Sequence, residues 1–230
     1  MKKKFNELKQ EFQLIHIAKN YHNLKWRSET MHRSSYAKMR YFKETYLNAD
    51  DELKILDIGS FDRDGNYNYG LILDEKKWTY HGLDLKKGNN VDIVVENAYD
   101  WKEIENETYD VVISGQAFEH IEFFWLTLEQ IRRVLKPGGL FCLIVPSSGP
   151  VHRNPYDCYR FNQDGMKAMA KYINFNILET GQNTDEIYKP WYDSHLIAKK
   201  PEKGSIEDLN YKMDKLEDKL DLIMSKLELD

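Results

Sequence analysis

Short apolar runs alternate with longer amphipathic segments from Lys54 to about Lys200, and this alternation constrains the fold more than any other feature. Several runs are apolar almost throughout, which is typical of strands that are covered on both faces. Strands that alternate with helices form a mainly parallel sheet with crossover connections. We therefore predict an α/β domain with strands at 54–59, 79–85, 91–96, 109–115, 140–147, 175–180 and 195–200.

Two connections between these strands have distinct signals. An amphipathic helix is predicted between the fourth and fifth strands, and Pro137-Gly138-Gly139 is expected to end it. Its apolar face consists of Phe124, Leu128, Ile131 and Leu135. No clear helix separates the last two strands, so we expect them to form an antiparallel hairpin that closes the sheet.

Composition excludes several classes of protein. The 230 residues carry 33 Lys and Arg against 38 Asp and Glu, and this net charge of -5 gives no general case for binding nucleic acid. No apolar run approaches the roughly 20 residues of a membrane span, and the basic start lacks the apolar region of a secretory signal. The two cysteines, Cys142 and Cys158, have neither metal-ligand spacing nor partners for a disulfide framework. We expect a cytoplasmic protein.

Both ends of the chain are predicted to be helical. Residues 1–50 form a helical cap, with apolar spacing at Phe5, Leu8, Phe12 and Ile15 and again at Met39, Phe42 and Tyr46. Its aromatics (Tyr21, Trp26, Tyr36 and Tyr41) either form a core, which we favour, or a lid. Residues 204–230 carry an a/d heptad seam: Ile206, Leu209, Met213, Leu216, Leu220, Ile223 and Leu227. Residues 206–227 are thus expected to make a homo-oligomeric coiled coil, with Lys212 at g and Glu217 at e favouring parallel chains; the alternative is one helix packed on the domain.

Two predicted strands end in carboxylates that suit a nucleoside site. Asp57 is followed by Gly59, and Asp84 ends the second strand. A carboxylate only accepts hydrogen bonds, so it can take both hydroxyls of a ribose. Alternatively, Asp84 merely begins a polar turn.

The order of the motifs ILDIGS, GLDL, ENAYDW, YDVVISGQAFEHI and RRVLKPGGLFCLIVPS resembles the class I S-adenosylmethionine-dependent methyltransferase family. The resemblance covers a domain at 51–201, and its most specific parts are FEHI at 118–121 and RVLKPGG at 133–139. It implies a Rossmann-like seven-stranded, mostly parallel sheet with an antiparallel last strand and helices on both faces. It also implies S-adenosylmethionine as cofactor, held by Asp57, Gly59, Ser60, Phe61, Asp84, Leu85, Asn97, Ala98 and Gln116.

The first loop departs from the family pattern. Phe61 and Arg63 stand where the family usually has glycines, and Gly65 comes late. We expect a loop of altered path in which Ser60 and Phe61 cover the cofactor; loss of binding is the alternative. Asn97 replaces the usual acid near the adenine and could accept from its amine, while Tyr99 or Trp101 could cover its face.

Candidate catalytic residues, and candidate residues for binding the molecule that accepts the methyl group, follow the fourth and fifth strands. His152 is the preferred general base, with Asp157 as its orienting partner. Glu119 and His120 are alternative catalytic residues, or else they cap a helix or form the pocket wall. Arg153, Tyr156, Tyr159 and Arg160 are predicted to bind the acceptor, although the same loop can be held by salt bridges. No metal is expected, because no carboxylate cluster is evident beside His152 and Asp157.

These features predict a methyltransferase that acts on a small polar molecule, by O-methylation of a sugar, glycan or related metabolite. A non-catalytic scaffold that oligomerises through its C-terminal helix is one alternative. A nicotinamide-dependent oxidoreductase is the other, but the chain lacks its G-x-G-x-x-G motif.

Overall fold

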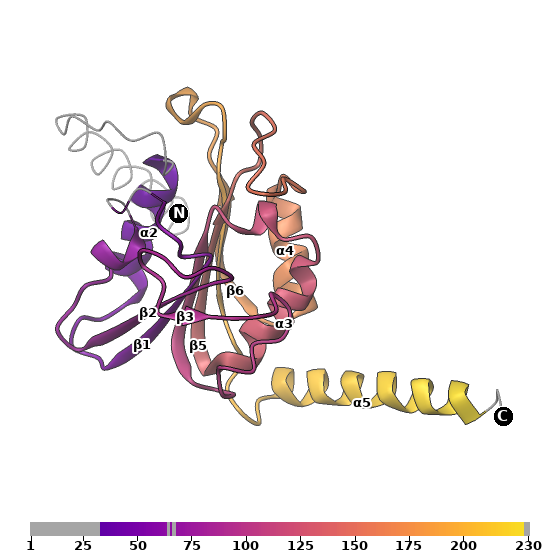
Figure 1. The fold of residues 1–230 in the computed structure, drawn as a ribbon. Helices are drawn as coiled ribbons and strands as arrows, with labels where there is room; N and C mark the ends of the chain where they lie inside the picture. Colours follow the sequence, from indigo (N-terminus) through magenta and orange to yellow (C-terminus); the bar gives the residue numbers. More distant parts are fainter. Residues whose placement is uncertain (1–32, 64, 66–67, 228–230) are drawn as a thin grey trace, which may run out of the picture.

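The computed structural model describes residues 33–63, 65 and 68–227 (Figure 1). The helical spacing predicted at residues 5–15 lies outside this part, as do Tyr21 and Trp26. The elements are, in order, α2 (Arg33–Tyr46), β1 (Leu53–Ile58), η1 (Tyr69–Leu71), β2 (Trp78–Asp84), β3 (Ile93–Val94), β4 (Tyr109–Gly115), η2 (Phe118–His120), α3 (Phe124–Val134), β5 (Leu135–Val145), α4 (Gln163–Tyr172), β6 (Asn176–Gln182), η3 (Glu186–Tyr188), β7 (Ser194–Lys199) and α5 (Ile206–Leu227).

All seven strands form one sheet in the order β3-β2-β1-β4-β5-β7-β6. β1 to β5 pair in parallel, whereas β7 is antiparallel to both β5 and β6. This topology confirms the predicted fold class and the closing hairpin. From β1 the chain continues to β2 and β3 on one side of the sheet, and it then returns to β4 on the other side of β1. In such sheets, ligands bind in the crevice between the carboxyl ends of the two strands, here β1 and β4, from which the chain runs in opposite directions.

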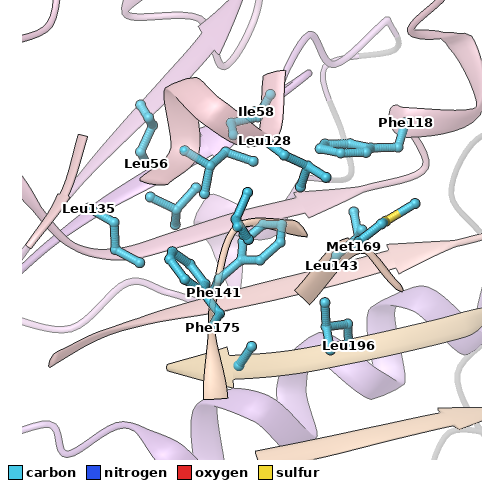
Figure 2. Close-up of a cluster of buried hydrophobic side chains, with 14 of the residues drawn as sticks. Leu56, Ile58, Phe118, Leu128, Leu135, Phe141, Leu143, Met169, Phe175 and Leu196 are labelled. Carbon is cyan, nitrogen blue, oxygen red and sulfur yellow. The ribbon is translucent and has the colours of Figure 1, made fainter. Parts of the chain in front are cut away.

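The sheet is covered on both faces, as predicted (Figure 1). On one face, Leu56 and Ile58 of β1 join a core built with α3 and α4 (Figure 2). On the other face, Ile55 packs with Met39 and Phe42 of α2, which are fully buried. Complete burial of such side chains contributes about 1.5–3 kcal/mol each, so α2 is an integral part of the sheet core.

Two details differ from the sequence-based expectation. α3 ends at Val134 and β5 begins at Leu135, so Pro137-Gly138-Gly139 lies within the strand, where the pairing with β4 shifts register. The Lys200 ammonium donates to the carbonyls of Arg132 and Leu135, which satisfies the end of the helix without the glycines. Among the described residues, moreover, the connections from β1 to β4 hold only the short η1 as helix.

α5 extends away from the sheet domain (Figure 1). It contacts α3 through the side opposite its heptad seam: the Arg132 guanidinium lies 3.5 Å from the centre of the Tyr211 ring, and Lys215 Nζ lies 3.5 Å from Glu129 Oε1. The seam residues are between 50% and 74% exposed, so they do not pack on the domain. No helix in the described part of the chain is long and apolar enough to cross a membrane.

Candidate active site

A cavity of about 720 Å³ opens at the carboxyl ends of β1, β2 and β4. Most of the predicted site residues line it: Asp57, Gly59, Ser60, Phe61, Asp84, Leu85, Ala98, Gln116, Glu119, His120, His152, Arg153 and Tyr156. Residues from the carboxyl ends of five strands, β1 to β5, thus meet at one edge of the sheet, which is where open α/β sheets bind ligands.

The tip of β1 requires glycine for two reasons. Gly59 has φ +73°, a conformation that side chains disfavour, and a Cβ there would lie 2.4 Å from the Cβ of Ala117. The Gly59 and Ser60 amides both donate to the Leu83 carbonyl at the end of β2. The loop after β1 is thus fastened to the end of β2 and lies against the loop after β4.

The loop after Gly59 follows a path that explains its missing glycines. Ser60 Oγ donates to the Asn90 carbonyl at 2.8 Å, and Asn90 Nδ2 donates back to the Ser60 carbonyl at 3.0 Å. The Phe61 ring packs over Gly88, where a Cβ would lie 2.1 Å from a ring carbon. The loop therefore runs across the turn at 88–90, and Phe61, which is 42% exposed, forms a wall of the cavity; its part in covering the cofactor stays a prediction.

The two strand-tip carboxylates have different surroundings. Asp84 lines the cavity, and its oxygens accept from the backbone amides of Lys86 and Phe61 at 3.1 and 3.3 Å. Asp57 is buried, and its carboxylate accepts from the Tyr80 hydroxyl at 2.5 Å. Burial raises the pKa of Asp57 to about 7. Asp84 is thus the carboxylate with capacity left for a ligand, while Asp57 holds β1 to β2.

Gln116 supplies an unsatisfied polar group at the same edge. It follows β4 with φ +58°, and both its side-chain nitrogen and oxygen are buried without a hydrogen-bond partner from residues 33–63, 65 and 68–227. Buried polar groups are normally paired, so an amide left unpaired in a cavity wall is suited to a bound molecule. Nearby, Leu85, Ala98 and Tyr99 form a partly apolar wall.

Asn97 needs a correction, because the structure does not place it in the cavity wall. Its side-chain oxygen accepts from the Tyr99 amide at 2.8 Å and shapes the turn after β3. One of the two lone pairs of the oxygen that was expected to meet an adenine is therefore used within the turn. Trp101 lines the cavity but is almost wholly part of the core, so Tyr99 is the more accessible ring.

On the other side of the cavity, Glu119, His120 and His152 form a compact cluster. Glu119 is fully buried, and neither carboxylate oxygen has a hydrogen-bond partner in the described part of the chain. Its Oε1 lies 3.7 Å from His120 Nε2 and 3.9 Å from His152 Nε2. Burial raises the pKa of Glu119 to about 8, and burial together with the neighbouring His120 lowers the pKa of His152.

The backbone explains why these groups meet. Glu119 and His120 lie on η2, directly after β4. The amides of Cys158 and Tyr159 donate to the Glu119 carbonyl at 2.7 and 3.2 Å, which fastens the long loop after β5 against η2. This fastening places His152 opposite Glu119, although the two are far apart in the sequence.

Asp157 lies behind His152, as predicted for an orienting partner. Its Oδ2 is 3.5 Å from His152 Nδ1 and accepts from the His152 amide at 2.7 Å. Hydrogen bonds from the Arg160 guanidinium, at 2.5 and 2.9 Å, hold the pKa of Asp157 well below its usual range. The predicted salt bridge of this loop is therefore present, and the orienting role of Asp157 stays a prediction.

Arg160 and Tyr159 do not line the cavity, and their predicted role in binding the acceptor is corrected. Arg160 is occupied by Asp157 and by the Pro150 carbonyl. The Tyr159 hydroxyl donates to the Glu122 carbonyl at 2.6 Å, and its ring packs on Phe124. Arg153 and Tyr156 remain at the cavity surface.

Trp191 is a cavity residue that the sequence did not reveal. Its ring lies 4.5 Å from that of His152, centre to centre, and it approaches Gly149 so closely that a Cβ there would lie 2.3 Å from a ring carbon. It comes from the loop before β7, where no local motif marks it.

The comparisons with known proteins agree with this geometry. A family model described as "Methyltransferase domain" matches residues 73–143, while a search of curated proteins gives no significant match. Among solved structures, the chain is similar to a putative methyltransferase of Haloferax volcanii in complex with the Trm112 activator, at 17% identity and TM-score 0.56, over 74% of this chain and 90% of the other. It is also similar to the Burkholderia thailandensis 1,6-didemethyltoxoflavin-N1-methyltransferase with bound S-adenosylhomocysteine, at 14% identity and TM-score 0.57, over 85% and 90%.

The chain therefore has the fold of the class I S-adenosylmethionine-dependent methyltransferases, and its residues 73–143 match the model of a methyltransferase domain, which confirms the resemblance seen in the sequence. The fold alone does not define the reaction. The [4+2]-cyclase SpnF is similar at 16% identity and TM-score 0.55, over 76% of this chain and 85% of the other. The reaction therefore depends on the residues that line the cavity.

Proposed function

We propose that this protein is an S-adenosylmethionine-dependent methyltransferase that O-methylates a small polar acceptor such as a sugar, a glycan or a related metabolite. One observation carries the proposal: a single cavity holds Asp84, suited to a ribose, and the Glu119, His120 and His152 cluster, suited to a proton. Groups suited to the cofactor and groups suited to the acceptor thus face the same cavity.

The residues present fit the cofactor. Asp84 would accept hydrogen bonds from the ribose hydroxyls, since a carboxylate is acceptor-only. The backbone from Gly59 to Phe61 would lie along the methionine portion, and the unpaired amide of Gln116 would gain a partner. Leu85, Ala98 and Tyr99 would contact the adenine. The bound cofactor supplies an activated methyl group, so the protein mainly aligns the acceptor and receives its proton.

His152 is the group we assign to that proton. The lowered pKa of His152 keeps its imidazole neutral near pH 7. If the ring hydrogen is on Nδ1, on the side of Asp157, the lone pair of Nε2 faces the cavity and can accept a proton. As the new O–CH3 bond forms, the acceptor O–H bond breaks and its proton passes to Nε2. Arg153 and Tyr156 offer further donors to a hydroxylated or anionic acceptor.

Calorimetry on the full chain tests the cofactor site. We expect binding of S-adenosylmethionine and S-adenosylhomocysteine, weakened by about 1–3 kcal/mol in Asp84→Ala, the scale of a hydrogen bond to a charged group. Asp164→Ala, which removes an exposed carboxylate of α4, is the matched control and should bind like the wild type.

The other outcomes are equally informative. No heat with either compound would leave the non-catalytic scaffold, and binding of a nicotinamide dinucleotide instead would favour the oxidoreductase. Equal affinity of Asp84→Ala and Asp164→Ala would mean that the ribose lies elsewhere. Labelled methyl transfer to a panel of sugars would then identify the acceptor. The cytoplasmic location stays a prediction, as does homo-oligomerisation through residues 206–227.

A further inference from the structure

Glu119 is a buried carboxylate that has no hydrogen-bond partner among the residues that the structure describes. The nearest ring nitrogens, at 3.7 and 3.9 Å, are beyond hydrogen-bonding distance. Buried carboxylates are normally paired or coordinate a metal, so this group points to a ligand that sits between it and the two histidines.

The spacing of the cluster matches a metal site. Glu119, His120 and His152 each offer one ligand atom, and these atoms all lie within 4.8 Å of one another. Metal bonds to imidazole and carboxylate are about 2.0–2.2 Å long, so two ligands of one ion are separated by up to about 4.4 Å. The distances of 3.7 and 3.9 Å from Glu119 to the two histidines fall inside this limit. The ligand atoms of His120 and His152 lie within 4.8 Å of each other, and small side-chain rotations would bring them within the limit as well.

Both imidazoles are also oriented for coordination. His120 Nδ1 lies 2.5 Å from the Tyr156 carbonyl, to which it can only donate, so Nε2 keeps its lone pair toward Glu119. A metal-ligating histidine typically gives its other ring hydrogen to such an oxygen.

His152 has the equivalent arrangement with a carboxylate, its Nδ1 facing Asp157 at 3.5 Å. Arg160 Nη2 is 3.3 Å from the same nitrogen, but its two hydrogens are directed to Asp157 and to the Pro150 carbonyl, at 2.9 and 2.7 Å. The imidazole hydrogen therefore belongs on Nδ1, and Nε2 is again the ligand atom.

We propose that Glu119, His120 and His152 form a binding site for a divalent transition-metal ion. Two imidazoles and one carboxylate suit Mn²⁺, Fe²⁺, Co²⁺ or Zn²⁺ better than Mg²⁺ or Ca²⁺, which prefer oxygen ligands throughout. The sequence suggested no metal because the carboxylate that completes the site, Glu119, was assigned to catalysis or to the pocket wall.

The open coordination positions face the cavity. On the proposed function, they would take hydroxyl oxygens of the acceptor, whose pKa a bound cation lowers. With an ion bound, His152 Nε2 would be a ligand in place of the base assigned above, and the hydroxyl proton would pass to water in the cavity. This role depends on methyl transfer; metal binding itself does not.

Titration of the metal-depleted full chain with Co²⁺ tests the site, followed by calorimetry and by the visible absorption of the bound ion. We expect one ion per chain. Glu119→Gln and His152→Asn should each lower the affinity roughly tenfold or more, the range seen when metal-site residues or their partners are changed. His81→Gln, which alters a histidine of β2 bonded to Tyr109, is the matched control and should bind like the wild type.

Equal Co²⁺ affinity of Glu119→Gln and the wild type, or no binding at all, would overturn the proposal. If Glu119→Gln fails to fold, His152→Asn decides, because its side chain is 34% exposed and tolerates change. S-adenosylmethionine binding is measured on the same samples. If the protein binds S-adenosylmethionine but not Co²⁺, only the metal site is contradicted. If it binds Co²⁺ but not S-adenosylmethionine, only the proposed function is contradicted.

Discussion

At the scale of single residues, Gly59 is the position where backbone conformation and packing both act. We predict that Gly59→Ala lowers the free energy of unfolding by about 1–3 kcal/mol, the scale of a residue held in an unfavourable conformation. The added methyl group would also lie 2.4 Å from the Ala117 Cβ. Urea denaturation measures the loss.

Gly204 provides the matched control for this experiment. Its φ is +80°, but a Cβ there meets no atom within 4 Å. Gly204→Ala therefore adds conformational strain alone, and the excess loss in Gly59→Ala measures the collision with Ala117. Equal losses in the two variants would show that the contact between the loops after β1 and β4 does not require glycine.

The positions of single residues were predictable from sequence where a residue directly follows a strand. Gly59, Asp84 and Gln116 end at the cavity because parallel strands share one carboxyl edge. Asn97 and Trp191 could not be placed, since their positions depend on a local turn hydrogen bond and on a loop distant in sequence. The sequence left open whether Asp157 pairs with Arg153 or with Arg160, and the structure shows the pair with Arg160.

At the scale of elements, Glu179 of β6 joins α2 to the antiparallel edge of the sheet. Its carboxylate accepts from Lys38, Tyr41, Tyr46 and His195 at 2.9–3.1 Å. We predict that Glu179→Gln lowers the free energy of unfolding by about 3 kcal/mol, because the buried Lys38 loses its counter-charge. Denaturation of Glu186→Gln, which removes an exposed charge of η3, should show almost no loss.

The wild type and Glu179→Gln should also differ in how their stability responds to pH. Burial would raise the pKa of Glu179, but hydrogen bonds from His195 and the charge of Lys38 outweigh it and hold the pKa well below its usual range. A lowered folded-state pKa gives stability that is present above the unfolded value, about 4.3, and is lost as the pH falls below it. The advantage of the wild type over Glu179→Gln should thus shrink from pH 5 to pH 3. A constant difference over that range would contradict this linkage.

The order of elements was predictable because apolar runs and turn residues are local signals. The boundary between α3 and β5 was not, since Lys200 from the far end of the domain ends the helix. The covering of the second face was likewise predicted only in part. α2 supplies it in place of long crossover helices, and this choice depends on how Met39 and Phe42 meet Ile55 across the fold.

At the scale of the whole molecule, the 22-residue α5 presents an apolar seam that its own domain does not cover. Its contacts with α3 come from Tyr211 and Lys215, on the opposite side. We propose a second copy of this chain as the partner, because the seam has the heptad spacing of a self-complementary coiled coil. Lys212 at g and Glu217 at e would attract one another between parallel helices.

Deletion of residues 204–230 should therefore lower the molar mass measured by light scattering from that of an oligomer to that of one chain. Each seam leucine that becomes buried contributes about 1.5–3 kcal/mol, so Leu216→Lys should also dissociate the oligomer. Asp214→Lys, which places the same charge outside the seam, should leave the mass unchanged. The cavity lies within the sheet domain, so S-adenosylmethionine binding should persist in the truncated chain. If the molar mass does not change after the deletion, α5 does not mediate homo-oligomerisation.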